Sequence, residues 1–213
     1  MRPPASWKRA RLTVGIAGAT ALAWAVPAAL GYSDQVALWG GFIPLRLMGV
    51  AGDEALAPVF LTPLTATFIH AGFLHLALNM LVLLFCGRSV ENILGPVGMG
   101  VLYVVGAYAA AAAQYFAGPL DVAPMVGASG AVSAVIGGFA MLFGRNRVNV
   151  RHPVIAFWLN ALWLAVAFTV LQLLIGLILQ TDGFRLAVYA HIGGFIAGLL
   201  LTRPLLRFRY RNA

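Results

Sequence analysis

Four polar side chains stand out in a chain that is otherwise almost entirely apolar. Ser129 lies in the stretch GASG and His191 in AHIGG, while His75 and Asn79 share the stretch HLALN. A serine beside a histidine can act as a nucleophile, because the imidazole accepts the hydroxyl proton as the oxygen attacks a carbonyl carbon. An asparagine and a second histidine can donate hydrogen bonds to the oxyanion that forms. These residue types indicate acyl-transfer chemistry.

The composition places these side chains in a membrane protein. Of the 213 residues, 62% are hydrophobic and 9% are charged, whereas a soluble domain carries about 25% charged residues. A helix needs about 20 mostly apolar residues to cross a hydrocarbon core about 30 Å thick. Six segments fit, at approximately 12–31, 66–86, 98–117, 127–143, 153–179 and 186–202. We therefore expect an all-α, polytopic bundle of six transmembrane helices that forms a single domain over 1–213.

The distribution of charge predicts the topology. With the N-terminus inside, 12 of the 14 Lys and Arg residues lie on the cytosolic side, including the basic tails 1–11 and 203–213, and only Arg46 and Arg185 fall outside. This asymmetry is what the positive-inside rule requires of an even number of spans with both termini cytosolic. The net charge of +8 therefore reflects topology. Nucleic acid is not an expected partner, because no basic patch carries interleaved aromatic residues.

The first segment also has features of a signal peptide, because basic residues precede an apolar run that ends in small residues. The run is longer than the roughly 7–15 residues of a signal-peptide core. A retained span is therefore the favoured interpretation. We expect a multi-pass integral protein surrounded by membrane lipid, in a bacterial cytoplasmic (inner) membrane.

The same topology brings the polar residues to similar depth. At about 1.5 Å per residue, His75 lies about 10 Å from the outer end of the second span and His191 about 8 Å from the outer end of the sixth. Ser129 begins the fourth span. His75 and Asn79 are four residues apart and share a helical face, whereas His70, five residues before His75, is expected to point elsewhere.

Two stripes of small residues indicate which helices touch. They are Gly194 and Gly198 on the sixth span and Gly130, Ala134 and Gly138 on the fourth. Small residues let two helix backbones approach closely in a membrane. If these stripes meet, Ser129 and His191 come within hydrogen-bond reach. Because no span contains a carboxylate, the expected arrangement is a Ser-His dyad, with an oxyanion held by the Ser129 N–H, His75 and Asn79.

The long outer segment 32–63 is too apolar for a solvated linker. It contains Trp39, Phe42, Ile43, Leu45, Leu47 and Met48. We expect short elements that lie in the membrane interface.

Taken together, the motifs resemble those of the rhomboid intramembrane serine proteases. The stretches HAGFLHLALNM, GASG and AHIGGFIAG occur in that order on the second, fourth and sixth spans, and the similarity covers about residues 60–202. The resemblance implies that Ser129 is the nucleophile, His191 the general base, and His75 and Asn79 oxyanion donors. It also implies structural roles near the site for His70, for Glu91 in the segment GRSVENILG, and for the motif glycines Gly127, Gly130, Gly194 and Gly198.

The resemblance further implies a serine endopeptidase without metal or cofactor, which cleaves single-span membrane proteins near the outer face. Two features depart from the family pattern. Ser133 stands where relatives often place an aromatic residue that packs on the catalytic histidine, and LTPLTATF replaces an obvious Trp-Arg pair before the second span. We therefore expect His191 to be held in a different way.

Three alternatives remain open. The histidines can be read as metal ligands, although no HExxH motif or acidic residue in a span completes a metalloprotease site. A non-catalytic relative that binds membrane proteins is the second alternative, although such a module does not need both Ser129 and His191. A transporter is the third, and the absence of paired broken helices in two repeated halves disfavours it.

Overall fold

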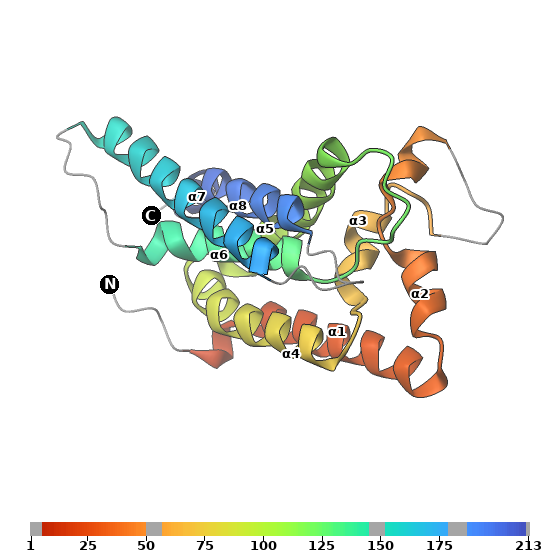
Figure 1. Cartoon of the computed structure of the whole chain (residues 1–213). Helices are drawn as coiled ribbons and strands as arrows, with labels where there is room; N and C mark the ends of the chain where they lie inside the picture. Colours follow the sequence, from red (N-terminus) through yellow and green to blue (C-terminus); the bar gives the residue numbers. More distant parts are fainter. Residues whose placement is uncertain (1–5, 50–56, 145–151, 179–186, 212–213) are drawn as a thin grey trace.

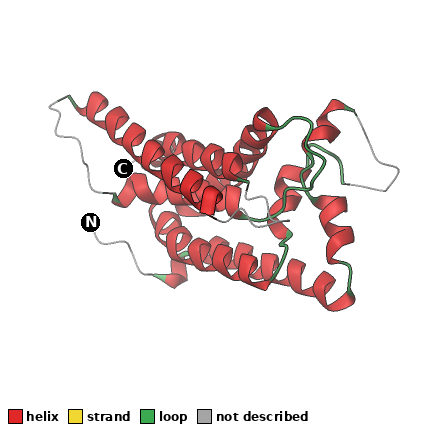
Figure 2. Cartoon of the chain, in the orientation of Figure 1, coloured by secondary structure: helices red, strands yellow, loops and turns green. Residues whose placement is uncertain are grey.

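The computed structural model describes residues 6–49, 57–144, 152–178 and 187–211, and helices dominate these ranges (Figure 2). The α-helices are α1 (Arg11–Leu30), α2 (Ser33–Gly40), α3 (Thr62–Thr65), α4 (Phe73–Val82), α5 (Arg88–Ala117), α6 (Ser129–Phe143), α7 (Pro153–Ile178) and α8 (Val188–Arg209). Three short 3₁₀ helices also occur, η1 (Trp7–Arg9), η2 (Pro44–Met48) and η3 (Ala66–Phe68). A π-helical turn, η4 (Leu83–Gly87), joins α4 to α5. Within these ranges no strand occurs, which confirms the all-α expectation.

Length and hydropathy mark three helical stretches as candidate membrane spans within the described ranges: Arg11–Leu30, Phe73–Ala117 and Val188–Arg209. Two shorter apolar helices accompany them, Ser129–Phe143 and Val154–Val170. The stretch Phe73–Ala117 runs through α4, η4 and α5 and bends at Gly95, whose φ of 74° no other residue type adopts readily. The protein is therefore an integral membrane protein.

Helices α5, α6 and α8 form the tightest part of the bundle. Figure 1 shows α7 running along α8 on one side and α1 alongside α4 on the other. A β-carbon added at Gly194 would collide with the carbonyl oxygen of Gly130, and one added at Gly198 would collide with that of Ala134. Gly194 and Gly198 of α8 thus contact α6, as predicted. The two backbones touch because no side chain separates them.

On the α6 side Gly130 and Ala134 meet α8 through their carbonyls and Gly138 lies beside Thr202, as predicted, but the packing of α6 involves more than this stripe. The missing side chain of Gly130 faces Ala110 of α5, and the α6 glycine that faces the α8 backbone is Gly137, beside the carbonyl of Phe195. Small residues occupy two faces of α6, because this helix packs against both α5 and α8. Gly106 of α5 likewise faces Ala134.

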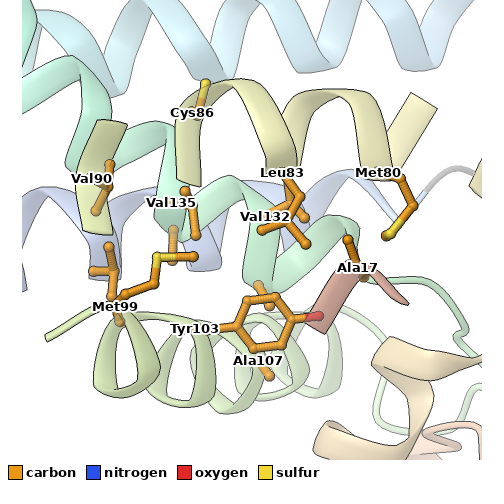
Figure 3. Close-up of a cluster of buried hydrophobic side chains, with 14 of the residues drawn as sticks. Ala17, Met80, Leu83, Cys86, Val90, Met99, Tyr103, Ala107, Val132 and Val135 are labelled. Atoms are coloured by element: carbon orange, nitrogen blue, oxygen red, sulfur yellow. The ribbon is translucent and has the colours of Figure 1, made fainter. Parts of the chain in front are cut away.

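A cluster of buried apolar side chains fills the space between α4, η4, α5 and α6 (Figure 3). Its labelled members include Leu83, Val90, Met99, Tyr103, Val132 and Val135. Cys86, a free thiol, belongs to this cluster, which agrees with its interpretation as a packing residue.

The first helix is fixed to α5 by one buried carboxylate. Glu91, which is 2% exposed, accepts hydrogen bonds from the N–H groups of Leu12 at 3.0 Å and Thr13 at 2.7 Å and from the Thr13 hydroxyl at 2.6 Å. The first N–H groups of a helix have no partner within the helix and carry partial positive charge, so an anion stabilises them. Glu91 therefore links α1 to the bundle.

The segment 32–63 contains α2 and η2, so the expected short elements are observed. The Thr65 hydroxyl donates to the carbonyl of Gly40 at 2.6 Å, which joins the end of α2 to α3. Phe42 pairs with Met125 as an isolated antiparallel bridge, with distances of 3.0 and 2.8 Å between the amide nitrogens and the carbonyl oxygens. The segment around Phe42 is thereby attached to the loop that leads into α6.

The α6–α8 contact predicts different effects on stability for two glycine substitutions. Gly198→Ala places a methyl group against the Ala134 backbone, and we expect it to lower the free energy of unfolding by about 1–3 kcal/mol. Gly18→Ala on α1 adds a methyl group with no atom within 4 Å, and we expect stability that is unchanged or raised by up to about 1 kcal/mol. Thermal unfolding in detergent measures both, and equal effects would contradict the proposed packing.

Candidate active site

The contact between Ser129 and His191 is the centre of the polar cluster. Ser129 is the first residue of α6, and its Oγ lies 2.8 Å from Nε2 of His191 on α8. His191 is 8% exposed, so little water competes for this contact. The distance is within the hydrogen-bond range required for proton transfer from a serine to a histidine.

Gly127 shapes the space in front of Ser129. Its φ of 120° is strained for any residue with a side chain. A β-carbon at this position would lie 2.7 Å from Cε1 and 2.8 Å from Nε2 of His75, and 3.7 Å from Oγ of Ser129. The His75 ring therefore packs directly against the Gly127 backbone, beside the serine hydroxyl. Only glycine satisfies both the backbone angle and the available space.

Two backbone hydrogen bonds hold the residues that precede Ser129. The N–H of Gly127 donates to the carbonyl of Ala66 at 2.9 Å, and the N–H of Ala128 donates to Nε2 of His70 at 3.3 Å. His70 is 3% exposed, and its ring meets the ring of His75 edge-on with centroids 4.9 Å apart. The loop before α6 is thereby fixed to the segment before α4.

The expectation that His70 points away from His75 is wrong. It assumed that both residues lie on one helix, but α4 begins at Phe73 and His70 lies in the preceding loop. The loop turns His70 back toward the site. Burial, together with the nearby His75, lowers the pKa of His70 to about 4, so the ring is neutral at pH 7 and its Nε2 remains available as an acceptor for Ala128.

Asn79 is buried one turn below His75, and its amide nitrogen donates to the His75 carbonyl at 2.9 Å. An amide group has two N–H donors, so this bond uses one and leaves the second for another acceptor. The first turn of α6 adds the Ser129 N–H, at the positive end of a helix dipole. The Ser129 N–H and the two side chains His75 and Asn79 of α4 are thus the candidate donors to an oxyanion.

Small side chains line a narrow cavity beside Ser129. It is bounded by, among others, Thr67, Ala107, Ala110, Gly130, Ala131 and Ala190. The sequence motifs did not identify Ala66 or the alanines of α5 as neighbours of the site. Their contributions are a backbone carbonyl and a lack of bulk, which a search for polar side chains overlooks.

The other predicted site residues lie further from the serine. Gly194 and Gly198 act through the α6–α8 contact described above, and Glu91 through α1. Ser133 is 3% exposed and packs toward Gly194. In the described part of the chain, no three His, Cys, Asp or Glu side chains gather in a group able to hold a metal ion.

The depressed pKa of His70 predicts a pH dependence of stability. The unfolded chain takes up this proton near pH 6.5, whereas the folded protein takes it up only near pH 4, so the free energy of unfolding falls as the pH is lowered from 6.5 toward 4. In His70→Gln the amide oxygen still accepts from Ala128 but does not titrate. We expect a flatter pH profile in thermal unfolding, and identical wild-type and variant slopes would refute this role.

Comparison with known proteins identifies the family of this chain. The family described as Rhomboid domain matches residues 59–208. The chain is 32% identical over 145 residues to RHOMBOID-like protein 4 of Arabidopsis thaliana, covering 67% of this chain and 33% of that protein. It is 32% identical over 143 residues to Rhomboid-type serine protease 2 of Emericella nidulans, covering 66% and 26%, and 29% identical over 161 residues to Rhomboid-related protein 3 of Homo sapiens, covering 68% and 36%. The chain spans about a third of the length of these relatives. With a domain match over more than half of its residues, this chain belongs to the rhomboid family.

Proposed function

We propose that the protein is an intramembrane serine endopeptidase in which Ser129 is the nucleophile and His191 the general base. The observation that carries the proposal is the 2.8 Å contact between the Ser129 hydroxyl and His191 Nε2. Family membership supports it, and one relative is named a rhomboid-type serine protease.

In the proposed mechanism, His191 removes the hydroxyl proton as Ser129 Oγ attacks the scissile carbonyl. The resulting oxyanion accepts hydrogen bonds from the Ser129 N–H, His75 and Asn79, and each well-placed donor contributes on the order of 3 kcal/mol. The protonated His191 then gives its proton to the leaving amine. Water attacks the acyl-enzyme with His191 again as base, which releases Ser129. No step requires a metal or a cofactor.

The proposed topology has six crossings with both termini in the cytosol. The two ends of the described chain support an even number, because both contact the same short segment. The Asn92 amide donates to the Ser6 carbonyl at 3.0 Å, and the Tyr210 hydroxyl donates to the Ile93 carbonyl at 3.1 Å. In this topology the Gly95 bend divides Phe73–Ala117 into two spans, and Ser129 lies near the outer face.

The proposed substrates are single-span membrane proteins cut near the outer face. This follows from the depth of Ser129 in the proposed topology and from membership of a family that contains proteases. A bacterial cytoplasmic membrane stays a prediction, since the relatives described above come from a plant, a fungus and a mammal.

The dyad is tested by removing each partner. We expect Ser129→Ala and His191→Ala to abolish cleavage of a single-span reporter, and Ser129→Ala to lose labelling by a fluorophosphonate in detergent. Ser33→Ala and His152→Ala change the same residue types at exposed positions and serve as controls with full activity. Full cleavage by the Ser129→Ala protein would overturn the proposal.

The oxyanion role of Asn79 predicts a partial defect. Asn79→Ala removes one of several donors, so we expect kcat to fall about a hundredfold to a thousandfold while cleavage remains measurable. A steady-state assay of the same reporter measures the change. An unchanged kcat would remove Asn79 from the mechanism.

The remaining alternatives give different results in the same assays. A non-catalytic binding module would retain the reporter without cutting it, and Ser129 would not react with the fluorophosphonate. A metal-dependent enzyme would lose activity on addition of a chelator, whereas the proposed mechanism is insensitive to chelation.

A further inference from the structure

A second cavity, widely open to the surface, lies away from Ser129, between the C-terminal half of α1 and α2. It measures about 310 Å³ and is lined by Ala23 of α1, Val36 and Trp39 of α2, and Thr65, Phe68 and Ile69. The lining is almost entirely apolar, and its one hydroxyl, that of Thr65, already donates to the Gly40 carbonyl. The proposed proteolytic mechanism does not use this cavity.

A cationic side chain, that of Arg46, is joined to this lining through the backbone of Ala57. Ala57 also lines the cavity. The N–H of Ala57 donates to the Trp39 carbonyl at 2.9 Å, and its own carbonyl accepts from Nη2 of Arg46 at 2.9 Å. The second terminal nitrogen of Arg46, Nη1, is buried and has no hydrogen-bond partner among the residues that the structure describes. A buried donor without an acceptor is costly, so this group favours an anionic ligand.

The surroundings indicate what the ligand is. Leu22 and Val26 of α1 and Leu38 of α2 are exposed apolar side chains, and in a membrane protein such a face meets acyl chains. A peptide segment would need hydrogen-bond partners for its backbone in an apolar site, and this lining supplies almost none. An acyl chain needs none, and a lipid phosphate is the anion that a guanidinium binds at the membrane interface.

We propose that this cavity and Arg46 bind one phospholipid, with an acyl chain in the cavity and the phosphate on the guanidinium. The site then fixes the position of α2 and of the outer segment relative to α1. The inference depends on the chain being a membrane protein and not on its being a protease.

Native mass spectrometry of the full chain in detergent tests the phosphate contact. The probes are phosphatidylglycerol and a diacylglycerol with the same acyl chains. We expect the wild type to bind one phosphatidylglycerol about tenfold more tightly than diacylglycerol, as one charge-assisted contact provides. Arg46→Gln loses this preference, whereas Arg207→Gln, the same change at an exposed position of α8, retains it. A preference that persists in Arg46→Gln overturns the proposal.

A second pair of variants tests the cavity without changing Arg46. Ala23→Trp fills the cavity, and we expect it to weaken the binding of both lipids at least tenfold. Ala19→Trp, on an exposed face of α1 outside the lining, leaves binding unchanged. If Arg46→Gln does not fold, this pair decides alone. Unchanged lipid binding in Ala23→Trp, or displacement of bound lipid by a single-span substrate peptide, overturns the lipid assignment. Because the experiment measures bound lipid, its result does not depend on whether the protein is a protease.

Discussion

The direct contact between the backbones of α6 and α8 is the constraint on which the rest of the site depends. Gly194 and Gly198 bring the carbonyls of Gly130 and Ala134 against α8 with no side chain between them. His191 lies one turn before Gly194, and Ser129 directly precedes Gly130, so this contact sets the separation of the hydroxyl and the imidazole. In lipid, such an approach gains van der Waals contact without a hydrophobic driving force. A larger side chain at this contact would push α6 and α8 apart. It would also separate the Ser129 hydroxyl from the His191 imidazole.

The loop before α6 orients the serine, and here the stabilising groups are mostly backbone. Gly127 supplies the positive φ and the space for His75, while the N–H groups of Gly127 and Ala128 are held by Ala66 and His70. His70 acts through a neutral ring that accepts a hydrogen bond. His75, which lies on α4, packs its ring against the backbone of Gly127 in this loop. His70, His75 and His191 therefore lie in three different environments.

The sequence predicted the helical class, the polar cluster and the meeting of the glycine stripes, because lipid makes polar residues and small-residue stripes rare and therefore informative. It did not predict where α4 begins. Residues 66–72 are apolar enough to extend the predicted span, but they form η3 and a loop, and the direction of His70 depends on that loop. It also did not distinguish Gly130 from Gly137, since the face that a glycine presents depends on two neighbouring helices. The end of α8 at Arg209 lies beyond the apolar span predicted to end at 202, because the backbone hydrogen bonds of this helix continue into the basic segment that follows.

The bridge between Phe42 and Met125 consists of two backbone hydrogen bonds. Such bonds are made by every residue type except proline at the donor position. This attachment of the segment around Phe42 to the loop before α6 therefore depends on backbone geometry rather than on polar side chains. A proline at either bridge position would remove one of these bonds and so disturb the segment around Phe42 together with the loop that leads to Ser129.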